Sequence, residues 1–346
     1  MAELKPTRRR RKMQSVTMTD VARLAAVSPS TVSLYLRKPS EVSPAISERV
    51  RTAIDQLNYV PNFVAGGLAS AGSRVVSIVV PSVRNAFFSS TVSQIEAALA
   101  QDGLLTLVGN NEYSLEVEES LVRAALSWTP AAIVLTGLKH SHATIRMLRD
   151  RTVPVIEMWQ AGPEPIMSAV GFSHHKAGLE MANHVLSKGY RRPVFVGARL
   201  DRDVRAAQRA SGHAAALEAQ GIRPTLVEDP RAASTTLGCD MLARVLGEHP
   251  ECDVIVCSSD VVALGIVFEA GRRNISIPGR IGLTGFGNLE FSATCNPGIT
   301  TVEPNSDRIA GEVVALIREN LAQKGTSPVR SKVIDTGFQI IARDSL

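Results

Sequence analysis

The spacing of apolar residues in the first sixty positions predicts three short amphipathic helices. Val21, Leu24 and Ala25 share one face at i, i+3 and i+4, and Val32 and Leu36 share a face at i, i+4. Three such helices with a tight turn between the first two are typical of a helix-turn-helix domain, here over residues 16–61. The stripe of the third helix comprises Ile46, Val50, Ala53, Ile54 and Leu57.

Capping residues mark where these helices are expected to begin. Thr19 is placed to cap the first helix, with Asp20 in its first turn. A Val-Ser-Pro break follows, and the second helix is expected to start at Ser30 or Thr31. Ser43 is placed to cap the third, because a proline in the first helical position follows it.

From Val75 onward, apolar strand-like runs alternate with amphipathic helical segments. Such alternation is typical of parallel sheets covered by helices. Two series of similar length predict a bilobed α/β sensor over residues 74–346, built from two doubly wound parallel sheets. The predicted strands are Val75–Val80, Leu104–Val108, Ala132–Leu135, Val153–Met158, Val194–Gly197, Val254–Cys257 and Ile281–Thr284, and the predicted helices are Ser90–Gln101, Leu115–Ser127, Thr144–Asp150, Ala177–Lys188, Arg205–Ala219, Thr235–Leu246 and Val261–Gly271.

Residues that follow the strands are candidate contacts for a small-molecule effector, because ligands of such sheets bind beyond the carboxyl ends of the strands. An aromatic ring among several hydrogen-bond donors suits a sugar. The alternative is structural: the phenylalanines would belong to the core, Glu157 to a buried ion pair, and the arginines to exposed helix starts. The candidates are Asn85, Phe87, Phe88, Glu157, Trp159, Arg199, Arg202, Arg205, Arg209, Ser259, Asp260, Gly287 and Asn288.

Positive charge is concentrated at the start of the 346-residue chain, whose net charge is +5. Residues 1–70 carry 11 Lys/Arg against 5 Asp/Glu, which is +6, and the rest carries 27 against 28, which is −1. One small module is therefore expected to contact a polyanion such as DNA. Within residues 1–15, the run Arg8–Lys12 forms either a disordered solvated tail or a non-specific phosphate-binding arm.

The second predicted helix suits the major groove of DNA. With Val32 and Leu36 directed inward, its opposite face offers small polar and apolar side chains to base edges, and its flanks reach phosphates. The alternative is that the hydroxyl residues are only caps and surface positions. The candidate DNA contacts in this domain are Thr17, Thr19, Ser28, Pro29, Ser30, Thr31, Ser33, Leu34 and Arg37.

Other classes of protein are disfavoured by the sequence. Apolar runs fall short of the roughly 18–20 residues that span a membrane, and the basic start lacks the apolar segment of a signal peptide, so a cytoplasmic location is expected. The four cysteines lack metal-ligand spacing and are expected to be core thiols. The sequence also lacks the dinucleotide, P-loop and nucleophile-elbow motifs, so neither an enzyme nor a cofactor is expected.

The stretch Val16–Ser70 resembles the DNA-binding headpiece of the LacI (lactose repressor) family. The shared motifs are T-x-x-D-V-A, V-S-x-x-T-V-S, L-x-Y-x-P-N and A-x-x-L, and the likeness continues through nearly the whole chain. The resemblance implies a homodimer or tetramer on a near-palindromic operator, and a periplasmic-binding-protein-like sensor whose chain crosses between lobes near Phe172, Thr301 and Asp335. The lack of a heptad extension after Ser331 favours the dimer.

By the same resemblance, residues 62–73 are a hinge helix and linker that orders on the operator. Asn62 opens the hinge, and Leu68 matches the leucine that wedges into the minor groove and kinks the duplex. Gly66 and Gly67 stand where better helix formers are usual. Because glycine costs about 1 kcal/mol in a helix interior, this hinge is expected to be weakly helical without DNA.

Two departures from the family bear on what the protein recognises. Leu34 stands where members often have an arginine that reads a guanine, so a standard family operator is not expected to be preferred. Arg209 in R-A-S-G-H matches the arginine that contacts the effector, with His213 in place of an aromatic residue. Gly287 replaces the family's sugar-binding aspartate, and the loss of that negative charge favours an anionic effector.

The chain is also similar to the gluconate-operon repressors of the family, through L-S-W, G-A-R-L-D, A-V-G-F and P-V-I-E. This similarity implies a sugar acid as effector: gluconate, or a phosphorylated or keto relative. The expected function is a repressor that the sugar acid releases from its operator. The alternatives are a regulator that responds to a neutral sugar or acts as an activator, and a sugar-binding protein without a role on DNA.

Overall fold

The computed structural model describes residues 16–60, 74–149, 152–323 and 331–346. The chain divides into two compact units, one of residues 1–71 and one of residues 72–346. Each unit has its own core of buried apolar side chains.

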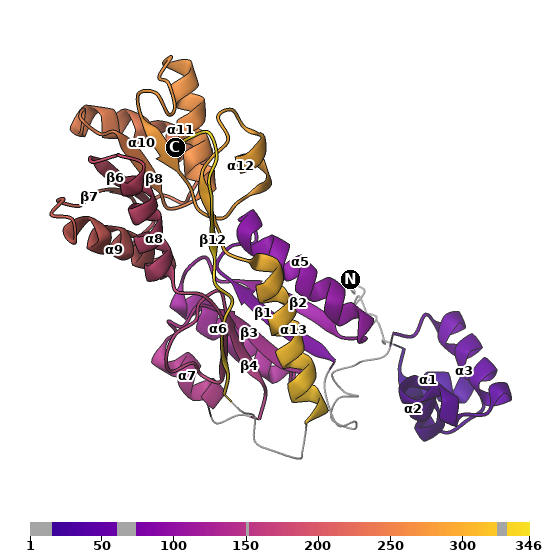
Figure 1. Cartoon of the computed structure of the whole chain (residues 1–346). Coiled ribbons are helices and arrows are strands. Elements are labelled where there is room, and N and C mark those ends of the chain that lie inside the picture. The colour runs from indigo at the N-terminus through magenta and orange to yellow at the C-terminus, as the bar shows by residue number, and fades with distance from the viewer. Residues whose placement is uncertain (1–15, 61–73, 150–151, 324–330) are drawn as a thin grey trace, which may run out of the picture. The chain divides into compact units, whose positions relative to one another are not determined.

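Within residues 16–60, the described part of the N-terminal unit, the three predicted α-helices are present (Figure 1). They are α1 (Met18–Leu24), α2 (Pro29–Arg37) and α3 (Pro44–Leu57), with the short 3-10 helix η1 (Pro39–Glu41) before α3. Their apolar faces meet in a small core, which explains why helices this short are stable together. The buried residues of this core are Val21, Ala22, Ala25, Val32, Val50 and Ala53.

The predicted caps of the first two helices were wrong. Thr17, not Thr19, caps α1: its hydroxyl accepts from the Asp20 backbone N–H at 3.3 Å, and the Asp20 carboxylate accepts from the Thr17 N–H at 3.0 Å. Ser28 caps α2, so this helix starts earlier than predicted. Leu24, the last residue of α1, is half exposed, whereas Val21 and Ala25 of the predicted face are buried.

The first lobe of the larger unit is a parallel six-stranded sheet with helices on both faces (Figure 1). Its strands lie in the order β11-β5-β4-β3-β1-β2. Helices α5 and α13 pack together on one face, and α6 and α7 pack together on the other. The elements are β1 (Val75–Val80), α5 (Ala86–Gln101), β2 (Leu105–Asn110), α6 (Leu115–Ser127), β3 (Ala132–Thr136), α7 (His142–Arg149), β4 (Val155–Met158), β5 (Ser168–Gly171), α13 (Ser306–Ala322) and β11 (Val333–Asp335).

The second lobe repeats this plan with a parallel four-stranded sheet in the order β7-β6-β8-β9. Helices α8 and α9 cover one face, and α10 and α11 cover the other. A Cβ on Gly178 of α8 would lie only 2.0 Å from the Arg209 carbonyl oxygen, so glycine lets α8 and α9 approach closely. The elements are α8 (His174–Ser187), β6 (Pro193–Ala198), α9 (Val204–Glu218), β7 (Thr225–Asp229), α10 (Thr235–Glu248), β8 (Val254–Cys257), α11 (Asp260–Arg272), β9 (Gly282–Thr284) and α12 (Glu290–Thr294).

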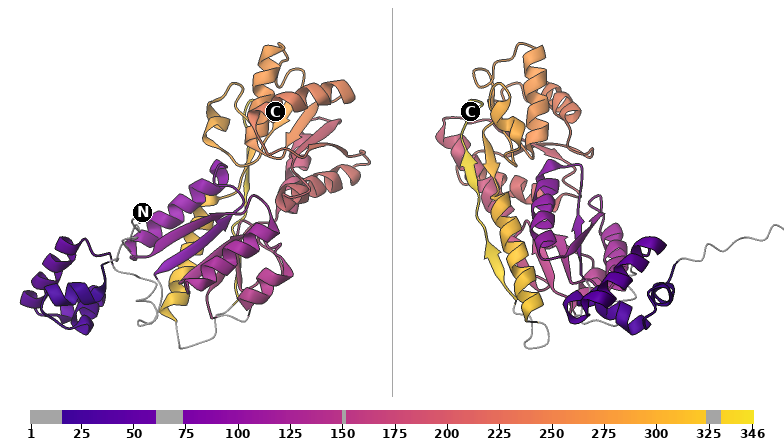
Figure 2. Two further views of the ribbon diagram at one scale, coloured as in Figure 1. Left: turned by 180° about the vertical axis from the view of Figure 1, so that it is seen from behind. Right: turned by 90° about the vertical axis from the view of Figure 1, so that its right-hand side faces the viewer.

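The chain crosses between the lobes three times, after β5 and through the antiparallel pair β10 (Thr301–Glu303) and β12 (Gln339–Ile341). Figure 2 shows β12 leading back to the second lobe, where the C-terminus lies. Hydrogen bonds join the crossing segments: the Thr336 backbone N–H donates to the Gly171 carbonyl at 2.7 Å, and the Asn305 amide donates to the Thr336 carbonyl at 2.9 Å. The crossovers expected near Phe172, Thr301 and Asp335 are therefore confirmed.

Candidate functional site

The N-terminus of α2 is held by a compact set of hydroxyl groups. The Ser28 hydroxyl accepts from the Thr31 backbone N–H at 3.1 Å, and it lies 2.7 Å from the Ser30 hydroxyl and 2.8 Å from the Thr31 hydroxyl. Pro29 occupies the first helical position, where its missing N–H costs nothing. Pro29 and Ser30 are exposed, so the first turn of α2 presents its polar edge to solvent.

The rest of α2 divides into a buried face and an accessible face. Val32 is fully buried, and Ser33 and Leu34 are partly accessible on other sides of the helix. Arg37 is exposed and donates from Nε to the Ser33 carbonyl at 3.2 Å. This pattern is what a helix needs in order to enter a groove while it stays anchored to its own domain.

Arg49 of α3 fixes the turn before α2, a role that the sequence analysis missed. Its guanidinium donates from Nε to the Ala25 carbonyl at 3.0 Å and from Nη2 to the Ala26 carbonyl at 2.7 Å. These carbonyls lie at the C-terminus of α1, where helix carbonyls lack partners within the helix. Ala26 has φ +51°, so the turn itself is tight.

Thr17 and Thr19, the other DNA candidates in this unit, are both exposed at the start of α1. The remaining candidates, Asn62 and Leu68 with Gly66 and Gly67, lie outside the described residues. The basic run 8–12 lies outside them as well.

A cavity of about 350 Å³ lies where the carboxyl ends of β1, β2 and β3 approach the loop before α9. The cavity is lined by segments of both lobes, as is expected of a ligand site between two parallel sheets. Among the predicted effector residues, Arg202 and Arg205 line this cavity. Its other polar lining residues are Asn111, Tyr113, Ser114, Glu116, Glu118, Thr136, Lys139, Gln160 and Asp201.

Arg205 is the most enclosed cation of the cavity, with 8% of its surface exposed. Its contacts with the protein are long: Nη1 lies 3.5 Å from the Thr136 carbonyl oxygen, and Nη2 lies 3.7 Å from the Asp203 carboxylate. The guanidinium also lies 6.0 Å from the centre of the Tyr113 ring, and burial raises the pKa of that phenol to about 12. Arg205 thus keeps hydrogen-bonding capacity for a ligand.

Arg209, one turn further along α9, makes shorter hydrogen bonds to the protein than Arg205 does, although its buried Nε has no hydrogen-bond partner in the part of the chain that the structure describes. It donates from Nη2 to the Ser258 carbonyl at 2.8 Å and from Nη1 to Nδ1 of His174 at 3.0 Å. His174 in turn donates from Nε2 to the Trp159 carbonyl at 2.8 Å, so this chain of bonds joins the two lobes. The Arg209 guanidinium lies 3.7 Å from the centre of the Phe286 ring, and burial lowers the pKa of Arg209 to about 10.

An aromatic cluster occupies the space beside Gly287. Phe87 stacks on Trp159 with ring centres 4.0 Å apart, and its ring lies 5.6 Å from that of Phe286. A Cβ on Gly287 would come within 3.5 Å of the Phe87 ring, and φ of +124° already disfavours other residues there. Trp159 is fully buried, so in this structure Phe87 and Trp159 act as core, which is the structural alternative considered for Phe87.

Two further candidates have structural partners. All polar contacts of the buried Asp260 carboxylate are internal: it accepts from the Thr301 hydroxyl at 2.6 Å, the Ser292 hydroxyl at 2.8 Å and the Leu289 backbone N–H at 2.8 Å. Burial raises the pKa of Asp260, and these donors oppose the shift. Asn85 caps α5 by accepting from the backbone N–H of Phe87.

Arg199 and Asn288 lie near other charged or aromatic groups. The Arg199 guanidinium lies 5.7 Å from the centre of the Tyr113 ring, next to the cavity. Asn288 donates to Glu303 at 2.7 Å and accepts from Arg343 at 2.6 Å. Ser259 caps α11.

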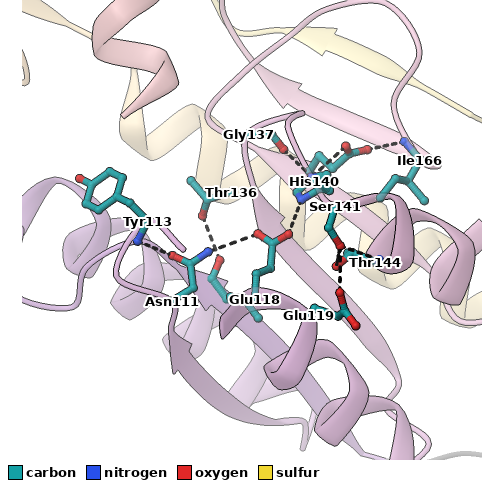
Figure 3. Close-up of polar contacts among 12 residues, drawn as sticks. Asn111, Tyr113, Glu118, Glu119, Thr136, Gly137, His140, Ser141, Thr144 and Ile166 are labelled. Atoms are coloured by element: carbon teal, nitrogen blue, oxygen red, sulfur yellow. Dashed lines mark hydrogen bonds and ion pairs between the residues drawn. The ribbon is translucent and has the colours of Figure 1, made fainter. Parts of the chain in front are cut away.

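Glu157 belongs to a buried network that the sequence analysis did not identify as a unit (Figure 3). His140 donates from Nδ1 to Glu118 at 2.7 Å, and its Nε2 lies 3.3 Å from the Glu157 carboxylate. Burial alone would lower the pKa of His140, but the hydrogen bonds and charges of the two glutamates raise it to about 9. The second oxygen of Glu118 accepts from Asn111 at 3.2 Å, and Asn111 and Glu118 line the cavity.

Within residues 16–60, 74–149, 152–323 and 331–346, the side chains form no cluster of three or more His, Cys, Asp or Glu that could hold a metal ion. The same described part of the chain contains no helix that is long and apolar enough to span a membrane. Its cysteines are free, and Cys252 and Cys257 are buried.

Comparison with known proteins identifies the family. Residues 17–62 match the model of the bacterial regulatory proteins of the lacI family, and residues 73–334 match that of the periplasmic binding proteins and sugar binding domain of the LacI family. The chain belongs to the LacI family. It is a DNA-binding transcriptional regulator with a periplasmic-binding-protein-like α/β sensor, as the motifs of residues 16–70 predicted.

Several LacI-family relatives cover nearly the whole chain. The HTH-type transcriptional regulator GntR of Pseudomonas aeruginosa is 34% identical over 95% of this chain and 95% of its own length. The HTH-type transcriptional regulator IdnR of Escherichia coli is 30% identical over 96% of this chain and 98% of its own length. The crystal structure of a LacI-family transcriptional regulator from Silicibacter pomeroyi matches with a TM-score of 0.88 at 32% identity, over 95% of this chain and 99% of that one.

Proposed function

We propose that this regulator is a cytoplasmic homodimeric repressor, which binds its operator through α2 and is released when a sugar acid binds between the lobes of the sensor. The observation that carries the effector class is the cavity at Arg205. Its lining carries three cations, Lys139, Arg202 and Arg205. Three carboxylates, those of Glu116, Glu118 and Asp201, line it as well. Glu118 is paired with His140 and Asp201 lies beside Arg202, so the enclosed Arg205 is the cation on which the proposal rests. The similarity to gluconate-operon repressors and the relatives named GntR and IdnR support gluconate or a phosphorylated or keto derivative. The protein acts by binding alone, without catalysis.

The carboxylate of the effector binds the Arg205 guanidinium in this proposal. A guanidinium has five N–H donors and accepts a carboxylate through two parallel hydrogen bonds. The long contacts of Arg205 leave such donors available, whereas Arg209 already donates to two protein acceptors. The hydroxyl groups of the sugar acid then face the Asn111 and Gln160 amides, which also line the cavity.

Release follows if the ligand prefers one arrangement of the lobes over another. The ligand contacts Lys139 of the first lobe and Arg205 of the second, so it stabilises the arrangement in which both reach it. Residues 62–73 are the proposed hinge that transmits this change to residues 16–61. The contacts of Thr17, Ser30, Ser33, Leu34 and Arg37 with DNA belong to the same proposal.

Calorimetry with the full-length protein tests the effector class. Gluconate, 6-phosphogluconate and 2-ketogluconate are titrated alongside glucose and ribose, and at least one acid should bind more tightly than both neutral sugars. Arg205→Met should weaken that acid at least about tenfold, since a charge-assisted pair is lost. Arg223→Met, at an exposed arginine away from the cavity, is the matched control. Tight binding of neutral sugars alone would overturn the sugar-acid proposal and favour a neutral-sugar regulator.

A footprint on the DNA upstream of the gene for this protein tests repression. Protection should appear without ligand and fade when the acid that binds is added. Protection that strengthens with the acid would instead indicate that the effector promotes DNA binding.

A further inference from the structure

A second cavity, of about 450 Å³, lies in the second lobe between α9 and the strands β6 and β7. Small side chains on α9 leave this space open, because Ala207, Ala210 and Ala214 all face it. Phe195 of β6 and Leu226 of β7 form the opposite wall, so most of the lining is apolar. This volume and apolar lining fall within the range of sites that hold small organic ligands.

The position of β7 explains why the cavity exists. This strand is the edge of its sheet, and Val227 packs into the core on the α10 and α11 side. Leu226 therefore points to the α9 side, where 50% of its surface is exposed. Helix α9 does not cover this edge of the sheet.

His213 lines the cavity and has two ring nitrogens that lack hydrogen-bond partners among the described residues. Only 1% of its surface is exposed. Burial lowers the pKa of His213 to about 4, so the ring is neutral at pH 7. The centre of the His213 ring lies 5.5 Å from that of the Phe195 ring. A buried imidazole without partners is unfavourable, and a ligand that bonds to it recovers that loss.

The charged groups that line the cavity are acidic. Asp201 and Glu228 belong to its lining, and the Asp201 carboxylate lies 3.7 Å from the Arg202 guanidinium, which offsets part of its charge. An anionic ligand would meet these carboxylates with a neutral imidazole as its polar partner. The lining therefore disfavours the class of ligand that the first cavity favours.

We propose that this cavity is a second small-molecule site of the regulator, which takes a compact, uncharged molecule with an apolar body and one hydroxyl group. A neutral imidazole has one N–H donor and one acceptor nitrogen, and a hydroxyl can pair with either, whichever tautomer is present. The apolar body fills the space along Ala207, Ala210 and Ala214.

The second site lies next to the first along one segment. Asp201 lines both cavities, and the loop that carries it leads into α9. One face of α9 carries three of the residues discussed above at intervals of four. Arg205 lines the first cavity, Arg209 takes part in the hydrogen bonds that join the lobes, and His213 lines the second cavity. An occupant of the second site thus contacts the same segment as the effector, without depending on which effector that is.

Three ring compounds that differ in one group test the proposal on the full-length protein: benzyl alcohol, toluene and benzoate, each by calorimetry and ligand-observed NMR. Benzyl alcohol should saturate one site per chain, with toluene about five-fold weaker for lack of the hydrogen bond. Benzoate should be at least tenfold weaker. A lack of saturable binding by benzyl alcohol, or equal binding of benzoate, would overturn the proposal.

Two variants locate the binding. Ala214→Phe fills the cavity and should weaken benzyl alcohol at least tenfold, whereas Ala243→Phe, at a half-buried alanine of α10 on the opposite face of the sheet, should leave it unchanged. His213→Phe keeps a ring and removes both nitrogens, so benzyl alcohol should fall to the affinity of toluene while toluene is unaffected. His213→Phe decides the matter if Ala214→Phe does not fold. Unchanged binding in both His213→Phe and Ala214→Phe, or full displacement by an excess of the sugar acid, would place the probe elsewhere and refute the site.

Discussion

The helix α2 and the cavity at Arg205, which is the proposed effector cavity, are built in opposite ways. α2 presents Ser30, Ser33 and Arg37 from nine consecutive residues, and its shape follows from a cap, a proline and one buried valine. The effector cavity takes its lining from loops that are far apart in sequence, such as those of Asn111 and Arg205. A surface of the first kind depends on local sequence, and a surface of the second kind depends on which side chains the tertiary structure has already engaged.

The largest effect is expected from a charge in the core beneath α2. Val32→Asp buries an unpaired carboxylate and should unfold the N-terminal unit, at a cost of several kcal/mol. The larger unit should keep its own thermal transition, followed by circular dichroism. Ser30→Asp, an exposed control on the same helix, should fold normally and weaken only DNA binding. If Val32→Asp protected DNA as the wild type does, the view of α2 as a locally determined surface would be wrong.

The next effect tests the tertiary network behind the cavity. His140→Leu leaves Glu118 and Glu157 buried without their cation and should lower the free energy of unfolding by about 3–5 kcal/mol in urea titrations. His142→Leu, at an exposed histidine of α7, should change it little.

The same network predicts how stability varies with pH. The folded-state pKa of His140 is raised from 6.5 to about 9, so its contribution of about 3 kcal/mol is complete below pH 6.5 and is lost as pH rises through 9. The difference in stability between wild type and His140→Leu should therefore shrink over this range. A difference that grows with pH would show that His140 is neutral in the folded protein.

Arg205 and Arg209 allow ligand binding and structural support to be compared within one helix, α9. Arg209→Met should cost about 2–3 kcal/mol of stability, because it leaves the Ser258 carbonyl and His174 without donors. Arg205→Met, whose contacts are longer, should cost less stability and more effector affinity. Thermal unfolding and calorimetry on both variants measure this, and the reverse order would show that Arg209 is the carboxylate partner.

A smaller effect is expected at Gly287. Gly287→Ala should cost about 1–3 kcal/mol, because φ of +124° is strained for other residues, although the space beside it would hold a Cβ at ordinary contact distance. Gly311→Ala on α13 is the control: its surroundings are open, and alanine should stabilise the helix slightly. Equal tolerance of both changes in urea titrations would contradict the positive φ at Gly287.

The smallest effect on stability is expected at the cap of α1, where the structure shows Thr17 and the sequence predicted Thr19. Thr17→Ala should lower the stability of the N-terminal unit by about 1 kcal/mol, since it removes the cap of α1. Thr19→Ala should change it by a few tenths at most. Comparable losses in thermal unfolding would mean that the capping box contributes little.

The sequence predicted most of the fold where apolar periodicity was strong. The strand Val75–Val80 and the helix Leu115–Ser127 were predicted at the bounds that the structure shows. The short strands β5 and β7 were missed, because few of their residues alternate clearly. The long helix α13 was missed as well, although its buried residues recur at helical spacing.

The effector residues were harder to predict for a physical reason. In sequence Arg209 is favoured over Arg205 by the R-A-S-G-H motif, and that Arg209 contacts the effector stays a prediction. Only the structure shows that two nitrogens of Arg209 already donate to protein acceptors, whereas the contacts of Arg205 are longer. Glu118 and His140 lie far apart in sequence, so their pairing required the folded sheet. Lys139 and Gln160 follow strands and could have been considered by the same rule that selected Trp159.

The three cross-linked passages between the lobes restrict how the sensor can move. One backbone hydrogen bond and two side-chain hydrogen bonds among Gly171, Thr336 and Asn305 tie these passages to one another, so movements that separate the passages must break them. A rotation of one lobe relative to the other, about an axis that runs through the three passages, strains these hydrogen bonds least. A ligand in the cavity at Arg205, as proposed above, would lie away from these passages and would act on the angle between the lobes rather than on their separation at the passages.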